Sequence, residues 1–315
     1  MLWLAGLMGL MAVGAVGVID MTTSEDITDE ENADTTTSAT TDDTATVEDE
    51  DDVTDVVGDD TLTLGSVSDD VLDGTDGDDT LYGEEGDDTL SGGAGDDTLH
   101  GEDGADVIAG GDGDDDIYGH NDDDVLDGGD GDDIMHGGLG ADVIAGGDGD
   151  DAVHGGLEDD TLTGGAGSDT LFGGWGNDVL NGVEDDPDTE AADDTDDSDF
   201  LNGGGGDDVI VAGQGDVVTA GEGADTIVTG SWIADGPAVD IIDFDAGDDN
   251  ILLVYEDETT EPDISLQIDP DDPAVTHVMM NGVPVANVMN GAEITIEDIA
   301  LMPFSLAQSS GMITA

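Results

Sequence analysis

Basic side chains are missing from this chain of 315 residues, which has 84 Asp and Glu residues and no Lys or Arg. The formal net charge of −84 opposes compaction through self-repulsion, because no salt bridge to Lys or Arg can offset it. Nucleic acid and anionic membrane surfaces are excluded as electrostatic partners, since both are negatively charged and repel such a chain. Multivalent cations are the partners that this composition requires.

Cysteine is absent too, and aromatic residues make up only 3% of the sequence. Disulfides, thiolate metal sites and cysteine nucleophiles are therefore excluded, and a core of large rings is not expected. None of the five His residues begins an H-E-x-x-H motif, and the chain has neither a G-x-S-x-G elbow nor a phosphate loop with Lys. We therefore expect no enzymatic activity.

The amino-terminal part of the chain contains two segments of opposite character. Residues 1–19 (MLWLAGLMGLMAVGAVGVI) form an uncharged apolar run that is long enough to span a bilayer as a helix. Because the basic region of a signal peptide is missing, an uncleaved membrane anchor, a cleaved signal segment and a short buried helix all remain open. Residues 20–57 are rich in Thr, Asp and Glu, which predicts a disordered acidic linker.

A nine-residue repeat organises residues 58–230. Its unit, exemplified by Gly92 to His100 (GGAGDDTLH), reads G-G-x-G-x-D-x-U-x, where U is apolar. From Gly65, thirteen consecutive units run to Asn181, with Gly at position one and Asp at position six of every unit. Position eight is always apolar and predicts one inward side chain per unit: Leu72, Leu81, Leu90, Leu99, Ile108, Ile117, Leu126, Met135, Ile144, Val153, Leu162, Leu171 and Leu180. A fourteenth unit opens at Gly182 and resumes at Asp199, so that residues 183–198 form an acidic insert.

Each unit divides into a turn and a strand. Gly at positions one, two and four permits a positive φ, whereas positions seven to nine favour β structure with the central side chain pointing inward. Two units complete a coil of eighteen residues, which predicts an all-β fold: a parallel β-roll, that is, a right-handed solenoid similar to a β-helix. Residues 231–302 contain alternating strands around an Asn281–Gly282 turn and predict a C-terminal β cap, followed by a loosely ordered tail over residues 303–315.

The stacked turns predict metal binding. Coils about 4.8 Å apart align the position-six aspartates in two columns, and a hard cation with six to eight oxygen ligands relieves their repulsion. One ion between each stacked pair of the thirteen-unit block amounts to about eleven Ca²⁺ ions, which supply much of the folding free energy. The candidate metal ligands are Asp70, Asp79, Asp88, Asp97, Asp106, Asp115, Asp124, Asp133, Asp142, Asp151, Asp160, Asp169, Asp178, Asp199, Asp208, Asp216 and Asp225.

The two columns are not equivalent. Position four is Gly in all six units of the block that belong to the Asp79 column. In the Asp70 column it is replaced three times, by Ser68, Asp122 and Glu158. Because a side chain at this position disfavours a positive φ, we expect weaker or fewer metal sites in the Asp70 column.

Position nine places rings on one outer face of the roll, at intervals of eighteen residues. Three interpretations remain open: stacking of neighbours along a sheet, a contact surface for a glycan, a mineral or a matrix partner, and a zinc or copper site at His136 and His154. The stripe consists of Tyr82, His100, Tyr118, His136, His154 and Phe172.

The repeat resembles the nonapeptide of the RTX, or hemolysin-type calcium-binding repeat, family. The resemblance covers about residues 60–228. It implies a secreted or surface-exposed protein of a Gram-negative bacterium whose roll folds where calcium is abundant. We therefore expect a calcium-binding, non-catalytic extracellular protein with a structural or adhesive role. The alternative is a calcium-buffering or carrier module that serves a separate exported enzyme.

Overall fold

The computed structural model describes residues 60–184, 198–233, 236–256, 261–289 and 294–310. The apolar segment expected over residues 1–19, the linker over residues 20–57 and residues 185–197 of the acidic insert lie outside the described residues, so these expectations remain predictions. Among the residues that are described, no helix has both the length and the apolar character needed to cross a membrane.

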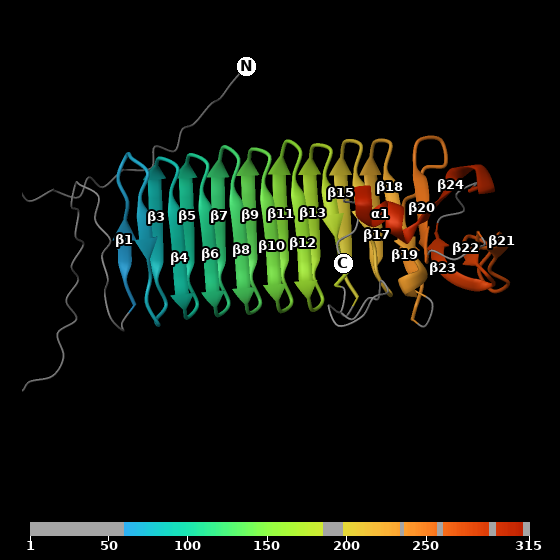
Figure 1. Ribbon diagram of the computed structural model, residues 1–315, viewed down its shortest axis with the longest axis horizontal. Coiled ribbons are helices and arrows are strands. Elements are labelled where there is room, and N and C mark those ends of the chain that lie inside the picture. The colour runs from blue at the N-terminus through green and yellow to red at the C-terminus, as the bar shows by residue number, and fades with distance from the viewer. Residues whose placement is uncertain (1–59, 185–197, 234–235, 257–260, 290–293, 311–315) are drawn as a thin grey trace, which may run out of the picture. The chain divides into compact units, whose positions relative to one another are not determined.

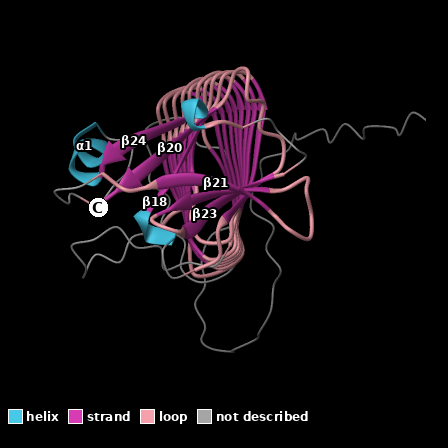
Figure 2. Ribbon diagram, turned by 90° about the vertical axis from the view of Figure 1, so that its right-hand side faces the viewer, coloured by secondary structure: helices cyan, strands magenta, loops and turns pink. Residues whose placement is uncertain are grey.

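The repeat forms a parallel β-solenoid in which two sheets face each other (Figures 1 and 2). From β1 to β20 the chain alternates between the sheets, so each repeat unit adds one strand to one sheet and the next unit adds one to the other. The predicted β-roll is thereby confirmed.

The strands of the two sheets have the following bounds. The thirteen-stranded sheet contains β1 (Leu62–Leu64), β3 (Thr80–Glu85), β5 (Thr98–Asp103), β7 (Asp116–Asn121), β9 (Ile134–Leu139), β11 (Ala152–Leu157), β13 (Thr170–Trp175), β15 (Phe200–Gly205), β17 (Val217–Glu222), β19 (Val239–Ile241), β23 (Val283–Val288), β22 (Thr276–Met280) and β21 (Ile264–Ile268). The eleven-stranded sheet contains β2 (Val71–Asp73), β4 (Thr89–Ala94), β6 (Val107–Asp112), β8 (Val125–Asp130), β10 (Val143–Asp148), β12 (Thr161–Ala166), β14 (Val179–Asn181), β16 (Val209–Val211), β18 (Thr226–Gly230), β20 (Asn250–Tyr255) and β24 (Ile299–Pro303).

Position eight supplies the core between the sheets. All thirteen predicted side chains are buried, with exposed fractions between 0 and 6%. Leu81 pairs in parallel register with Leu99, and Leu99 with Ile117, so the eighteen-residue coil is also confirmed. Burial of one such side chain stabilises the fold by roughly 1.5–3 kcal/mol, and each strand contributes only one at this position. The core is therefore thin: each repeat unit of nine residues buries only one side chain at this position.

Most strands of the roll are longer than the sequence pattern predicts. The pattern assigned only positions seven to nine to a strand, whereas β3 and β5 continue through positions one to three, where Glu84 pairs with Glu102. Parallel stacking brings these turn residues of successive coils into register, so the ladder of backbone hydrogen bonds continues past the last β-favouring residue. Position two therefore points to the same outer face as position nine.

The acidic insert leaves the register of the roll intact. Leu171 pairs with Leu201 across it, just as Val153 pairs with Leu171 one coil earlier. A chain can lengthen at an exposed turn without changing the register of the strands on either side.

The C-terminal region both extends the roll and closes it with antiparallel strands. β19, β20 and β24 continue the two sheets in parallel. β22 and β23 pair antiparallel across Asn281 and Gly282, whose φ angles of 54° and 83° match the predicted hairpin turn. Short 3₁₀ helices occupy Ser231–Ile233 and Ile296–Asp298. The tail expected over residues 303–315 contains a helix, α1 (Phe304–Ser310), whose Ala307 is buried.

Candidate metal centre

The position-six aspartates lie in the turns between the strands. These turns form the two edges of the roll (Figure 1). Sixteen of the seventeen predicted residues are buried, with at most 2% of each exposed, and Asp70 in the first coils is half-buried. A buried carboxylate needs hydrogen bonds or a cation, because transfer of a charge out of water is costly. The burial of a whole series of acidic residues in a chain without Lys or Arg is thus the central physical problem of this fold.

In every predicted ligand except Asp70, one carboxylate oxygen accepts a hydrogen bond from the preceding coil. The backbone N–H of Asp97 donates to Oδ1 of Asp115 at 2.7 Å, and that of Asp124 donates to Oδ1 of Asp142 at 2.8 Å. The same contact recurs along both edges and orders the aspartates into two ladders. The Asp79 column contains Asp79, Asp97, Asp115, Asp133, Asp151, Asp169, Asp199 and Asp216. The Asp70 column contains Asp70, Asp88, Asp106, Asp124, Asp142, Asp160, Asp178, Asp208 and Asp225.

The second oxygen, Oδ2, is buried without a hydrogen-bond donor in most of these residues. Native proteins leave few such atoms unsatisfied, so a regular series of them points to a missing ligand. The residues with this orphaned oxygen are Asp88, Asp97, Asp106, Asp115, Asp124, Asp133, Asp142, Asp151, Asp160, Asp169, Asp178, Asp208 and Asp225.

The pKa values of these carboxyl groups reflect the same deficit. Burial raises the pKa of Asp124 to about 8, and the neighbouring Asp142 adds to the increase, although the backbone N–H of Asp106 opposes it. Burial likewise raises the pKa of Asp115 to about 7 and that of Asp133 to about 6. Without a cation, the folded chain therefore favours protonated turns at a pH where free aspartate is ionised.

The turns fit a hard cation. A Cβ added to Gly92, at position one, would collide with Oδ2 of Asp97 and with the carbonyl oxygen of Gly110 in the next coil. Glycine at this position therefore leaves room for two oxygens from successive coils to approach each other. Carboxylate and backbone carbonyl oxygens are the ligands that Ca²⁺ takes in proteins, six to eight at a time. These turns can supply such a set, and the chemistry of the donors matches the expectation from the sequence.

One further aspartate extends the Asp70 column beyond the predicted ligands. Asp249 is 3% exposed, accepts a hydrogen bond from the backbone N–H of Asp225 at 3.1 Å and another from Asp245 at 2.7 Å. The signal was present in the sequence, because Gly247, Asp249 and Ile251 occupy positions four, six and eight of one more unit. Asp249 follows Asp225 by 24 positions rather than 18, and this change of period hid it.

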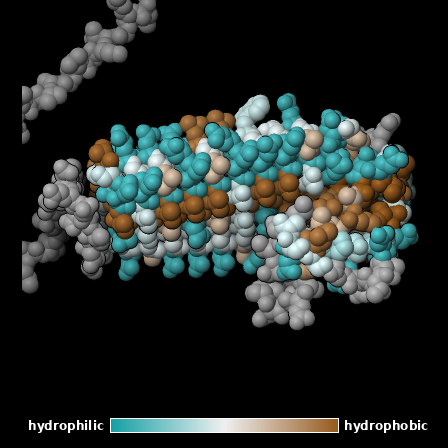
Figure 3. Space-filling model, turned by 45° about the horizontal axis from the view of Figure 1, so that its top comes forward, coloured by the Kyte–Doolittle hydropathy of each residue, from teal (hydrophilic) through white to brown (hydrophobic). Residues whose placement is uncertain are grey.

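The position-nine rings stack on one another along the thirteen-stranded sheet. Ring centroids lie 4.6 Å apart for Tyr82 and His100, and 4.8 Å apart for His154 and Phe172. His136 and His154 stack face to face at 4.8 Å with 12° between their planes. Because the faces of the rings pack against one another, mainly the ring edges reach solvent. Few ring faces are then free to contact a sugar, which favours the stacking interpretation over a glycan surface. Hydrophobic and hydrophilic side chains form separate bands along the roll (Figure 3).

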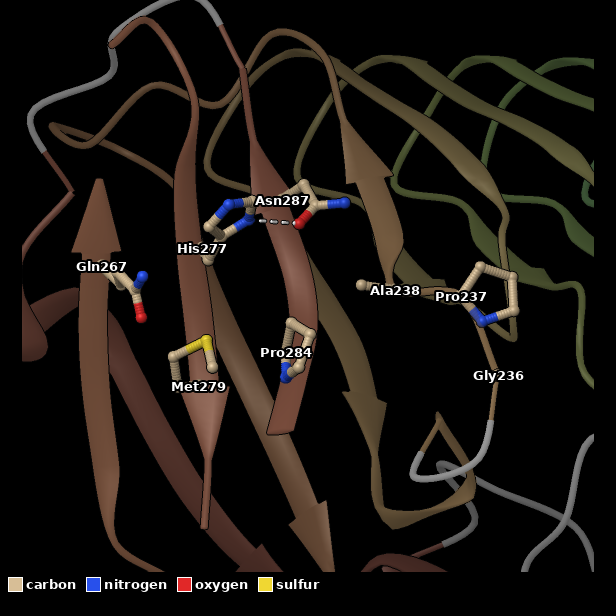
Figure 4. Close-up of a pocket in the computed structure, with 8 residues that line it drawn as sticks. All are labelled: Gly236, Pro237, Ala238, Gln267, His277, Met279, Pro284 and Asn287. Atoms are coloured by element: carbon tan, nitrogen blue, oxygen red, sulfur yellow. Dashed lines mark hydrogen bonds between the residues drawn. The ribbon is translucent and has the colours of Figure 1, made fainter. Parts of the chain in front are cut away.

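A cavity of about 270 Å³ lies at the C-terminal end of the roll (Figure 4). His277, on β22, lies 2.7 Å from Oδ1 of Asn287 through Nδ1 and 3.0 Å from Oδ2 of Asp269 through Nε2. Asn287 donates through Nδ2 to Asp240, which assigns its Oδ1 to the histidine. Both ring nitrogens are thus engaged. The lining, which contains no Ser, Thr or Cys, consists of Gly236, Pro237, Ala238, Gln267, His277, Met279, Pro284 and Asn287.

Comparison with known proteins gives one family. The model of the RTX calcium-binding nonapeptide repeat (4 copies) matches residues 64–99, 91–126, 100–135, 127–162, 154–186, 190–218 and 216–231, which together make up about half of the chain. No curated protein matches.

Two solved structures are similar to parts of the chain. A solution structure of a subunit of the mannuronan C5-epimerase from Azotobacter vinelandii is 22% identical, with a TM-score of 0.26, and the match covers 46% of this chain and 80% of that one. A crystal structure of an extracellular lipase from Serratia marcescens is 16% identical, with a TM-score of 0.26, and the match covers 76% of this chain and 40% of the lipase.

Proposed function

Because this chain belongs to the family of RTX calcium-binding nonapeptide repeats, we propose that its two aspartate columns bind Ca²⁺ between successive coils. The observation that carries the proposal is the series of buried Oδ2 atoms without a hydrogen-bond donor. The ligands are the position-six carboxylates predicted from the sequence, together with Asp249 and carbonyl oxygens of the turns. Bound ions neutralise the columns and become part of the scaffold.

We further propose that the protein is secreted or surface-exposed and that its role is structural or adhesive rather than catalytic. The absence of sequence motifs for a protease, a hydrolase elbow or a phosphate loop supports this proposal. In the described part of the chain, the cavity at His277 has no nucleophilic side chain in its lining and both nitrogens of its histidine are engaged. Any glycan, mineral or matrix partner remains a prediction.

A matched pair of substitutions in one turn tests the calcium ligands. Asp133 is buried with an orphaned Oδ2, whereas the adjacent Asp132 is exposed. Asp133→Asn is expected to lower the number of bound calcium ions by one or two per chain, because its carboxylate lies between two coils. Asp132→Asn changes the charge equally and is expected to lose none. Equilibrium dialysis with radioactive calcium measures both, and equal losses in the two variants would rule out column-specific binding.

The difference between the two columns provides a second test. Among the described residues of the roll, five non-glycine residues have a positive φ, and all five belong to turns of the Asp70 column: Glu84, Glu102, His120, Asp122 and Glu158. The sequence pattern had pointed only to position four. Calcium titration by calorimetry is expected to resolve a tighter and a weaker class of sites. Glu158→Gly should strengthen the weaker class and raise the free energy of unfolding by about 1 kcal/mol, because it relieves a strained φ of 83°.

Glu158→Gln serves as the control for this second test, since it removes the charge and keeps the strain. It should leave the free energy of unfolding of the calcium-loaded chain close to that of the wild type. A single homogeneous class of sites that neither variant alters would contradict the assignment.

A further inference from the structure

A second group of metal-ligating side chains lies outside the aspartate columns, on the outer face of β5 and β7. His100 and Glu102 are two residues apart on β5 and therefore point to the same side of the sheet. His120, on β7, is the register partner of Glu102 and the diagonal neighbour of His100. Three side chains from two adjacent strands thus meet at one point of the surface.

Their ligand atoms are close enough to share one ion. Nδ1 of His100 lies 2.9 Å from Nε2 of His120, and Nε2 of His120 lies 3.9 Å from Oε1 of Glu102. One such atom from each of the three side chains lies within 4.8 Å of the other two. Ligand atoms around a tetrahedral Zn²⁺, at about 2.0–2.1 Å from the metal, are about 3.3 Å apart. Small rotations of the side chains would bring these atoms to that spacing.

The aromatic stack holds the ring of His100 in place. Tyr82 and Tyr118 stack on its two sides, with ring centroids 4.6 and 4.8 Å away. The ring of His120 also stacks here: its centroid lies 5.2 Å from that of His100 on β5 and 5.8 Å from that of Tyr118 on β7. A ligand whose ring is already oriented loses less conformational entropy on binding, which favours metal affinity.

The surrounding charge also favours a metal ion. Glu102 has no Lys or Arg anywhere in the chain with which to pair. A metal ion taken from solution would supply the positive charge that this carboxylate lacks.

Two of the three side chains occupy a position that strains the backbone. Glu102 and His120 stand at position two of their units with φ angles of 81° and 83°, where later coils of the same edge have glycine, as at Gly138 and Gly156. Each such residue destabilises the fold relative to glycine. Strain of this kind is common at functional sites, although Glu84, the register partner of Glu102, is equally strained.

We propose that His100, Glu102 and His120 form a separate site for a transition-metal dication such as Zn²⁺. Two imidazole nitrogens and one carboxylate oxygen suit Zn²⁺ and its neighbours in the first row, whereas Ca²⁺ and Mg²⁺ select sets made of oxygen alone. The side chains of His120 and Glu102 are 36% and 41% exposed, so a fourth position remains open to water or to a donor from another molecule. The site differs from the zinc or copper site considered at His136 and His154, whose rings lie face to face.

Zinc titration of the full chain in millimolar calcium tests the proposal separately from the calcium columns. A chromophoric chelator competes for Zn²⁺, and the wild type is expected to take one tightly bound ion. His120→Gly removes one ligand and relieves strain, so it should fold at least as well as the wild type. We expect it to lose more than the roughly 10- to 100-fold in affinity that loss of a mere outer-shell partner costs. His100→Phe keeps a ring in the stack, removes Nδ1 and should have the same effect.

Glu158→Gly is the matched control, since it relieves an equal φ of 83° about two coils away from His120 and should leave zinc affinity unchanged. Replacement of Zn²⁺ by Co²⁺ provides a second readout. Co²⁺ bound by two histidines and one carboxylate has the intense visible absorption bands of a tetrahedral site, and His120→Gly should abolish these bands. Circular dichroism in calcium verifies the fold of each variant. The proposal is overturned if the wild type binds no zinc tightly, or if His120→Gly and His100→Phe bind it as the wild type does.

Discussion

Removal of calcium at neutral pH is expected to unfold the roll. Thirteen buried Oδ2 atoms have no donor within the described residues: those of Asp88, Asp97, Asp106, Asp115, Asp124, Asp133, Asp142, Asp151, Asp160, Asp169, Asp178, Asp208 and Asp225. Each unsatisfied buried oxygen costs about 1–3 kcal/mol, and more when it is charged. A whole domain is stable by only about 5–15 kcal/mol. The sum of these costs exceeds any such stability, so the fold cannot persist with ionised and metal-free columns.

Far-UV circular dichroism of the purified chain measures this effect. In EGTA at neutral pH the spectrum should be that of a disordered chain, and millimolar calcium should convert it to a β-rich one. Magnesium at the same concentration should be ineffective, because Mg²⁺ requires a tighter octahedral arrangement of ligands. Full sheet content in EGTA would contradict this account of the fold.

Acid is expected to stabilise the metal-free roll. Burial raises the pKa of Asp115 and Asp151 to about 7 and that of Asp124 to about 8, above the ordinary value of 3.8 that applies to the unfolded chain. The folded state therefore holds protons more tightly than the unfolded state does. This contribution to stability is fully present below about pH 4 and is lost as the pH rises through about 6 to 8.

Circular dichroism of the calcium-free chain in chelator-treated buffers between about pH 5 and pH 8 tests the pH dependence. Sheet content should be higher at the acidic end, and sedimentation at each pH should verify that the change is not aggregation near the sequence pI of about 4.1. Asp124→Asn mimics the protonated carboxyl group permanently. It should stabilise the metal-free chain at pH 7.5 and weaken calcium binding. The opposite sign of either effect, or equal sheet content across this range, would refute the prediction.

The repeat made most of the fold predictable. Leu99 and Ile117 were identified as core residues, and Asp97 and Asp115 as members of one column, because a strict nine-residue period determines which side chains point inward. Asp249 was missed because it follows Asp225 by 24 positions rather than 18, and a period cannot be followed across an interval of a different length. The residues lie in one column all the same, since the β18–β20 ladder restores the register.

The coil, the core and the acidic columns can be predicted from the sequence, because all three follow from residue types that recur in fixed phase. Which outer side chains meet depends on how the coils stack. Strands that continue into positions one to three bring His120 beside His100 and Glu102, although the pattern had assigned position two to a turn. The physical reason is that hydrogen bonds between stacked coils, rather than the β propensity of single residues, determine where each strand ends.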